Sequence, residues 1–187
     1  MTSLRGRLDA YLAVVSKRDV RAYTDEALPD DVLQAILQSG RATGSARNRQ
    51  HWRFVVVRGQ DALAALAPNV AAPRNVQGCA AAVAVVLTGP MAAWDGGRLA
   101  QNMMVAAWAF GVGSCPNTVT ADGDAGAREL LGVGEGESFV TILSLGYPAE
   151  PVPRSTDPEA VLARIDRKPL DELVTWVGDR PGAAGNA

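Results

Sequence analysis

The first candidate for chemistry is a cluster of three cations near the start of the chain. Lys17, Arg18 and Arg21 lie within five positions of one another, in the segment KRDVRAY. A guanidinium can bind a phosphate through two parallel hydrogen bonds, and an ammonium adds a compact positive charge. The pattern therefore indicates an anion site, with a solvated loop between two helices as the alternative.

A second group of polar side chains occupies residues 43–52, TGSARNRQHW, just before the β-branched segment RFVVVR at 53–58. The first segment predicts a loop and the second a strand. Polar loops at the edge of a sheet often carry binding groups, although the same composition suits a simple connection. We interpret His51 as a packed loop side chain, with a proton donor as the alternative.

The composition excludes several kinds of catalytic site. A single histidine rules out a histidine-cluster metal site and argues against a Ser–His–Asp catalytic triad. Cys79 and Cys115 are too few and too far apart for a disulfide framework or a zinc site. Because no resolving cysteine lies near Cys115 in the sequence, we interpret it as a packed residue and not as a redox thiol. The net charge of −2 gives no basic field for nucleic acid or an anionic membrane. We therefore expect any chemistry to belong to a bound cofactor.

A single domain must position these candidates. The 187 residues are 48% hydrophobic and 20% charged, which suits one sizeable core. Apolar periodicity and helix-start signals predict helices at 4–15, 29–40, 61–66 and 127–131. Apolar or β-branched runs predict strands at 53–58, 80–87 and 138–145. Loops are expected at 68–78 and 117–126. This order of elements indicates an α+β or α/β fold with a small sheet and helices outside it.

The most apolar helix is predicted between Asp95 and Gly113. Asp95 is the predicted N-cap, and Gly111 with Gly113 forms the predicted C-terminal stop. Nearly every position from Leu99 to Phe110 is apolar, so we expect burial on every side, in a core or a subunit interface. The apolar run is shorter than the roughly 20 residues of a membrane span, and no signal peptide is visible, which predicts a cytoplasmic protein.

The C-terminal part of the chain is read from its composition. Residues 167–176 have apolar positions at helix-like spacing, and the last residues are small and polar. No repeat and no interdomain linker is visible. We therefore expect one domain over residues 1–179, followed by a disordered tail at 180–187.

Four segments occur along the chain in a recognisable order. They are KRDVRAY (17–23), SARNRQHWRF (45–54), DGGRLAQNMMVAAWAFGVGS (95–114) and LGYPAEPVPR (145–154), with RKPLDELVTW (167–176) as a weaker fifth. Taken together, they resemble the FMN-dependent nitroreductase family, and the compact bacterial members most. The resemblance implies a nitroreductase-like α+β fold, in which helices flank a mostly antiparallel central sheet. It also implies an intertwined homodimer with FMN at the subunit interface, where residues of both chains line each site.

The resemblance implies roles for charged residues near the flavin phosphate. Lys17, Arg18 and Arg21 match the cations that hold the FMN phosphate and ribityl chain. Arg154, after the LGYP turn, matches a late cation that reaches the same phosphate. Asp19 stands where serine is more common, and we expect it to orient Arg18 or Arg21 or to cap the next helix.

Other positions match the surroundings of the flavin ring. Ser45, Asn48 and Gln50 match polar positions beside the isoalloxazine or the substrate, and His51 stands where proline is usual. Asn75 lies about where the family places a side chain on the pyrimidine edge.

The segment after the apolar helix aligns with backbone that donates to flavin N5. Because Pro116 has no N–H, we expect the donor among Asn117, Thr118 and Val119.

The activity implied by the resemblance is an FMN oxidoreductase that works by ping-pong hydride transfer. NADH or NADPH would reduce the flavin at N5, and a small acceptor of nitroaromatic or quinone type would then be reduced. Such a reaction needs no metal and no protein nucleophile. The physiological acceptor and a deazaflavin donor stay open. Two alternatives keep the fold: divergent flavin chemistry (fragmentation, dehalogenation or dehydrogenation), and a flavin-binding protein without turnover.

Overall fold

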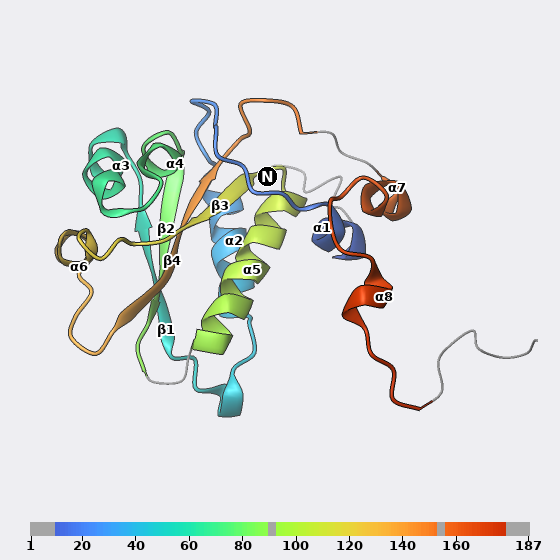
Figure 1. Cartoon of the computed structure of the whole chain (residues 1–187). Helices are drawn as coiled ribbons and strands as arrows, with labels where there is room; N and C mark the ends of the chain where they lie inside the picture. The colour runs from blue at the N-terminus through green and yellow to red at the C-terminus, as the bar shows by residue number, and fades with distance from the viewer. Residues whose placement is uncertain (1–9, 90–92, 153–155, 179–187) are drawn as a thin grey trace, which may run out of the picture.

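A computed structural model of the chain describes residues 10–89, 93–152 and 156–178 (Figure 1). Its centre is one four-stranded sheet in the spatial order β1-β2-β4-β3, in which every neighbouring pair is antiparallel. The strands are β1 (Trp52–Val57), β2 (Ala81–Leu87), β3 (Gly113–Asn117) and β4 (Ser138–Gly146). This arrangement confirms the α+β fold with an antiparallel central sheet.

Helices surround the sheet. The helices are α1 (Ala10–Ser16), α2 (Asp30–Arg41), α3 (Gln60–Leu66), α4 (Pro73–Gln77), α5 (Ala93–Ala109), α6 (Asp124–Leu131), α7 (Pro158–Leu162) and α8 (Leu170–Leu173). Short 3₁₀ turns are η1 (Ala46–Asn48) and η2 (Ala67–Asn69). None of the helices in the described part of the chain is long and apolar enough to cross a bilayer.

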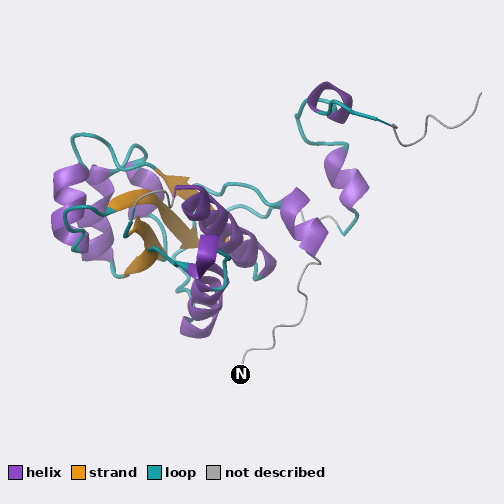
Figure 2. Ribbon diagram, turned by 90° about the horizontal axis from the view of Figure 1, so that it is seen from below, coloured by secondary structure: helices purple, strands orange, loops and turns teal. Residues whose placement is uncertain are grey.

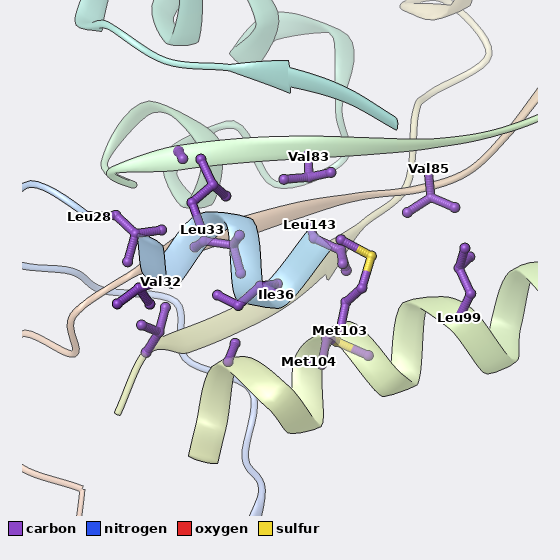
Figure 3. Packing of buried hydrophobic residues seen from close by; sticks show 14 residues of the cluster. Leu28, Val32, Leu33, Ile36, Val83, Val85, Leu99, Met103, Met104 and Leu143 are labelled. Carbon is purple, nitrogen blue, oxygen red and sulfur yellow. The ribbon is translucent and has the colours of Figure 1, made fainter. Parts of the chain in front are cut away.

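The two faces of the sheet carry separate hydrophobic cores. Because successive side chains of a strand point to opposite faces, alternate residues of β2 enter different cores. Val83 and Val85 pack with Leu143 of β4 against α2 and α5 (Figure 3). Ala84 and Val86 face the other side, where α3, α4 and α6 pack. All seven residues of β2 are buried, which explains its continuous apolar run.

Helices α2 and α5 lie in close contact on their face of the sheet. Gly40 makes this approach possible, because a Cβ at that position would lie 2.8 Å from the sulfur of Met103 and 2.8 Å from the ring of Phe54. Real Cβ atoms do not tolerate such distances, so the absence of a side chain at Gly40 fixes how closely the helices pack.

Helix α5 differs from its prediction at its start and agrees at its end. It begins at Ala93, so Asp95 lies inside the first turn and pairs with Arg98 at 3.2 Å; the predicted N-cap is wrong. At the other end, Gly111 has φ of 85° and its N–H donates to the Trp108 carbonyl. The N–H of Val112 donates to the carbonyl of Ala107, five positions earlier, at 2.9 Å, which completes a Schellman-type stop.

Burial of α5 is one-sided within a single chain. Leu99 and Met103 are fully buried against the sheet and α2, whereas Gln101 and Asn102 are exposed. Val105 and Ala106 are half-buried. The expectation of burial on every side, in a core or a subunit interface, stays a prediction, because the elements of one chain cover only one side of the helix.

The remaining boundaries agree with the sequence except at short elements and at α6, which begins at Asp124, inside the predicted loop 117–126. The three predicted strands lie within one residue of β1, β2 and β4. β3 occupies residues expected to lie in loops, because glycine and proline in its sequence GSCPN depress strand propensity. Proline is tolerated there because β3 is an edge strand. α4 and α7 have five residues each, too few to show a helical period in the sequence.

The C-terminal arm, residues 163–178, extends away from the sheet (Figure 2). α7, which precedes it, packs beside α1. Within the predicted segment 167–176 only Leu170–Leu173 is helical, and none of its residues is buried. Leu170, Leu173, Trp176 and Val177 are exposed apolar side chains. Residues 4–9 of the first predicted helix and the predicted tail at 180–187 lie outside the described residues.

Candidate functional site

The cationic segment, residues 17–21, runs along the outer edge of β3. Asp19 pairs with Ser114 in a parallel bridge, and the N–H of Val20 donates to the Ser114 carbonyl at 3.0 Å. A Cβ at Gly113 would lie 2.7 Å from the Cβ of Val20, so glycine at 113 permits this close approach. Main-chain contacts with Ser114 thus fix the cationic segment against the edge of the sheet, although the segment does not form a strand of its own.

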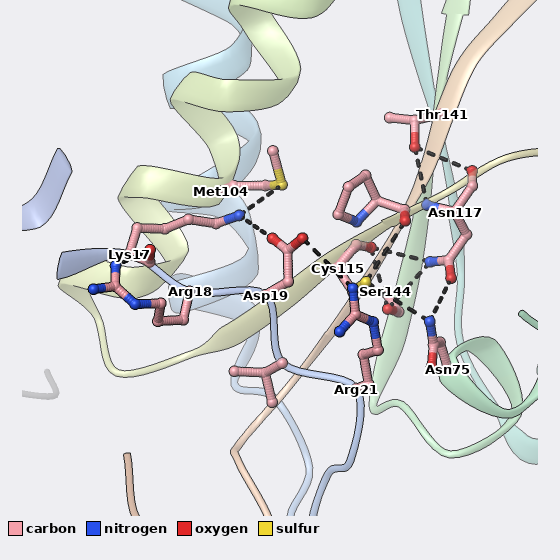
Figure 4. Close-up of polar contacts among 12 residues, drawn as sticks. Lys17, Arg18, Asp19, Arg21, Asn75, Met104, Cys115, Asn117, Thr141 and Ser144 are labelled. Carbon is pink, nitrogen blue, oxygen red and sulfur yellow. Dashed lines mark hydrogen bonds and ion pairs between the residues drawn. The ribbon is translucent and has the colours of Figure 1, made fainter. Parts of the chain in front are cut away.

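Charges of the cationic segment are arranged around one carboxylate (Figure 4). The ammonium of Lys17 donates to the carboxylate of Asp19 and lies 3.5 Å from the sulfur of Met104. The other oxygen of Asp19 is 4.0 Å from the guanidinium of Arg21. The Lys17 side chain is only 10% exposed, whereas that of Arg21 is 67% exposed. Two cations and one carboxylate leave a net charge of +1, and Arg21 is the cation that a ligand can reach.

Arg18 is directed away from this group. Its guanidinium donates to the main-chain carbonyls of Val15, at 3.0 Å, and Lys17, at 2.8 Å, at the end of α1. Asp19 therefore contacts Lys17 and Arg21 and not Arg18. No helix follows Asp19 until α2, which excludes the predicted capping role.

The floor of the site is the buried thiol of Cys115 on β3. Nδ2 of Asn75, on α4, lies 3.7 Å from this sulfur, and the guanidinium of Arg21 is near enough to lower the pKa of the thiol. Burial raises the pKa of the Cys115 thiol, and the negative charge of Asp19 raises it further against the opposing effect of Arg21. A raised pKa keeps the thiol protonated, which favours the interpretation of Cys115 as a packed residue.

Buried amides continue the site into the sheet. Nδ2 of Asn75 donates to Oδ1 of Asn117 at 3.0 Å, and these residues are 6% and 3% exposed. The main-chain N–H of Asn117 donates to Oγ1 of Thr141 at 3.1 Å. Because this donor is already used, Asn117 cannot offer it to a flavin, and of the three predicted donors Thr118 and Val119 remain.

Several members of the network were not predicted from the sequence. Ser144 of β4 is fully buried, lies 3.3 Å from Nδ2 of Asn117 and 2.8 Å from the hydroxyl of Tyr23. Burial raises the pKa of Tyr23 far above its usual range. The available signal was the presence of Thr141 and Ser144 in the otherwise apolar strand SFVTILSL, since buried hydroxyls need partners.

The polar loop, residues 43–51, holds its own geometry. Asn48 and Gln50 have left-handed φ of 53° and 51°, as does Arg47 at 55°. The N–H of Gln50 donates to Oγ of Ser45 at 3.0 Å, and Nε2 of Gln50 donates to Oδ1 of Asn48 at 3.1 Å. Non-glycine residues in this conformation cost of order 1–3 kcal/mol each and cluster at functional sites. Asn48 and Gln50 are exposed, so their polar groups are accessible.

His51 follows at the end of this loop. Its carbonyl accepts from the N–H of Thr88 at 3.1 Å, and its ring packs over Gly89. These contacts favour the interpretation of His51 as a packed loop side chain.

The polar loop and the cationic segment lie at opposite ends of α5 (Figure 1). Gly44 lies beside Arg98 in the first half of α5, whereas Ser16 accepts from the indole N–H of Trp108 at 2.9 Å near its last turn. Both groups also approach the middle of the helix, where Nδ2 of Asn102 donates to Oγ1 of Thr43 at 2.8 Å and Lys17 lies 3.5 Å from the sulfur of Met104. Among the described residues, no hydrogen bond or ion pair joins Ser45, Asn48 or Gln50 to the cationic segment.

The late segment predicted to reach the phosphate begins beside the cationic segment. The N–H of Ala149 donates to the carbonyl of Ala22 at 3.0 Å. A cavity of about 200 Å³ lies between residues 19–22 and 148–152. Arg154 itself lies outside the described residues.

The sequence and the fold are both similar to those of known proteins. The model of the "Nitroreductase family" matches residues 14–83 and 89–147. A proposed NADH dehydrogenase/NAD(P)H nitroreductase of Archaeoglobus fulgidus is 28% identical, over 73% of this chain and 84% of the relative. An NADH dehydrogenase of Thermus thermophilus is 27% identical, over 90% of this chain and 96% of the relative. The solved structure of a proposed nitroreductase from Desulfovibrio desulfuricans in complex with FMN has a TM-score of 0.76 at 26% identity, covering 92% of this chain and 99% of that one.

Proposed function

Because the chain belongs to the nitroreductase family, we propose that this oxidoreductase is an FMN-dependent NAD(P)H enzyme with its cofactor at the edge of β3. The main support for this position of the cofactor is one observation. Three segments far apart in the sequence place an accessible guanidinium, Arg21, and a buried amide, Asn75, around the same thiol of Cys115. Relatives named as NAD(P)H nitroreductases and a solved FMN complex support the choice of cofactor and donor.

The residues present fit the polar parts of FMN. A phosphate needs charge-assisted donors, and Arg21 is exposed and only loosely paired to Asp19 at 4.0 Å. Lys17 adds a second cation behind it, while Asp19 is the one opposing charge. Asn75 supplies an amide for the pyrimidine edge. We expect Arg154 to add a further cation, because the chain leading to it starts beside Ala22.

Bound FMN would supply hydride transfer at N5, from NADH or NADPH and then to a small nitroaromatic or quinone-type acceptor, in a ping-pong sequence. The chain's own residues bind and orient the ligand. The main-chain N–H of Thr118 or Val119 is the proposed donor toward N5. No protein general base or nucleophile is required, which suits a site whose thiol pKa is raised.

A homodimer completes the proposed site. Ser45, Asn48 and Gln50 bond within their own loop and not to the cationic segment, so in the proposed site a second copy supplies the polar loop. The uncovered side of α5 and the exposed apolar side chains of the C-terminal arm support the same assembly, because obligate interfaces are rich in such groups.

The test is a flavin spectrum followed by an anaerobic titration. Purified protein, with FMN added if it is colourless, should show bound-flavin absorbance that bleaches on addition of NADH or NADPH and returns with a quinone acceptor. Failure to take up FMN would refute the cofactor. Bound flavin that saturating donor does not reduce indicates a flavin-binding protein without turnover, and flavin consumed on re-exposure to air indicates divergent chemistry.

A further inference from the structure

Two side-chain amides of the site are held in a fixed orientation by the sheet. Nδ2 of Asn117 lies 2.9 Å from the main-chain oxygen of Ile142 and 3.0 Å from that of Cys115. Carbonyl oxygens only accept hydrogen bonds, so the group that faces them must be the NH₂ of Asn117. Its Oδ1 consequently points the other way, toward Asn75 (Figure 4).

The orientation of Asn117 then sets that of Asn75. Oδ1 of Asn117 accepts from Nδ2 of Asn75 at 3.0 Å, and the reversed Asn75 amide would place two oxygens against each other. Both side chains are almost completely buried, so water cannot relieve such a clash and the reversal is costly. The second contact of Asn75, to the sulfur of Cys115 at 3.7 Å, also uses Nδ2.

Oδ1 of Asn75 has no side-chain or main-chain partner among the described residues. Within residues 10–89, 93–152 and 156–178, every buried side-chain nitrogen or oxygen has a hydrogen-bond partner. The side-chain bonds of Asn75 to Asn117 and Cys115 both leave from Nδ2. The oxygen is therefore not fully buried, and it is the polar atom of Asn75 that stays available to a ligand.

We propose that Asn117 is a positioning residue that makes Asn75 an obligate hydrogen-bond acceptor, and that this acceptor selects the N3–H of the flavin ring. The inference rests on the proposed function. On the pyrimidine edge of oxidised flavin, N3–H is the one donor and lies between two carbonyls. An amide with a free orientation serves either kind of atom, whereas the fixed Oδ1 of Asn75 serves only the donor.

The orientation is tested on the protein alone by NMR of side-chain amides. The NH₂ hydrogens of Asn75 and Asn117 should exchange slowly with solvent, in contrast to those of exposed Asn48. In Asn117→Ser, the NH₂ of Asn75 loses its acceptor and its exchange should accelerate. Exchange of the Asn75 NH₂ as fast as that of Asn48 in the wild-type protein would overturn the proposal.

The selection is tested with FMN and 3-methyl-FMN, which lacks the N3–H. The wild-type protein should bind FMN roughly tenfold more tightly, because the methyl group leaves Oδ1 of Asn75 unpaired. In Asn75→Ala and Asn117→Ser the ratio of the two affinities should fall toward one. Ser144→Ala is the matched control: it removes one acceptor of Asn117 but leaves both main-chain carbonyls, so the ratio should persist.

The outcomes separate this inference from the proposed function. FMN that binds as tightly as its methylated form to wild-type protein refutes the selection and leaves the cofactor intact. Protein that binds neither form refutes the proposed function, while the NMR measurement still decides the orientation of Asn75. If Asn117→Ser does not fold, the two wild-type measurements alone uphold or overturn the proposal.

Discussion

Replacing Arg21 by alanine should weaken FMN binding, whereas replacing Arg18 should not. Both substitutions remove one guanidinium from the same segment, three positions apart. Arg21 is 67% exposed beside Asp19, while Arg18 is bonded to two carbonyls at the end of α1. Arg18→Ala is therefore a control with the same change in charge and sequence context.

The magnitude follows from the contact that Arg21 is proposed to make. A hydrogen bond to a charged group contributes about 1.5–3 kcal/mol, and the exposure of Arg21 places it at the lower end. A loss of about 1.5 kcal/mol raises the dissociation constant roughly tenfold. The local charge would also fall from +1 to zero, so the affinity of Arg21→Ala should depend less on salt.

The assay is titration of apoprotein with FMN, followed by the change in flavin fluorescence, at two salt concentrations. We expect a dissociation constant about tenfold higher for Arg21→Ala and within about twofold of wild type for Arg18→Ala. Equal losses in the two variants would mean that general charge, and not the placement of Arg21, governs binding. An unchanged affinity in Arg21→Ala would move the phosphate elsewhere.

Three other predictions use different parts of the structure. Asp19→Asn removes the carboxylate that competes for both cations, so FMN should bind about three- to tenfold more tightly in the same titration; weaker binding would show that Asp19 organises the site. Gly40→Ala should lower the free energy of unfolding by about 1–3 kcal/mol in a urea titration, because its Cβ would overlap Met103, and an unchanged midpoint would contradict this packing. The Arg53 side chain holds the pKa of Glu137 at about 2, below its usual 4.5. The stabilisation of the folded state by the Arg53–Glu137 pair is therefore complete above about pH 4.5 and is lost as the pH falls toward 2. Glu137→Gln should therefore be less stable than wild type at pH 7 and equally stable near pH 2; a stability difference that does not change with pH would refute the assignment.

The sequence predicts the fold best where a local pattern reports burial. β2 is a continuous apolar run because both of its faces are covered, and Gly111 ends α5 because the left-handed residue of a helix stop favours glycine. β3 was missed because glycine and Pro116 give no strand signal. Its existence depends on pairing with β4, which lies more than 20 residues further along the chain.

The site was predictable in its residue types but not in its orientations. Lys17, Arg18 and Arg21 look equivalent in sequence. In the structure, however, Arg18 donates to a carbonyl at the end of α1, and Lys17 donates to the carboxylate of Asp19. Apart from the carbonyl of Cys115, the partners of Asn117 come from residues 24–42 positions away, so no local sequence pattern predicts its network.

In the proposed assembly, the cationic segment of one chain and the polar loop of a second copy form one FMN site, so flavin binding requires two copies. Native mass spectrometry of FMN-loaded protein over a dilution series tests it most directly, because it reports chain number and flavin number in the same species. We expect two flavins on each pair of chains and loss of flavin as the pairs dissociate. Single chains that retain FMN at the affinity of the pair would contradict it.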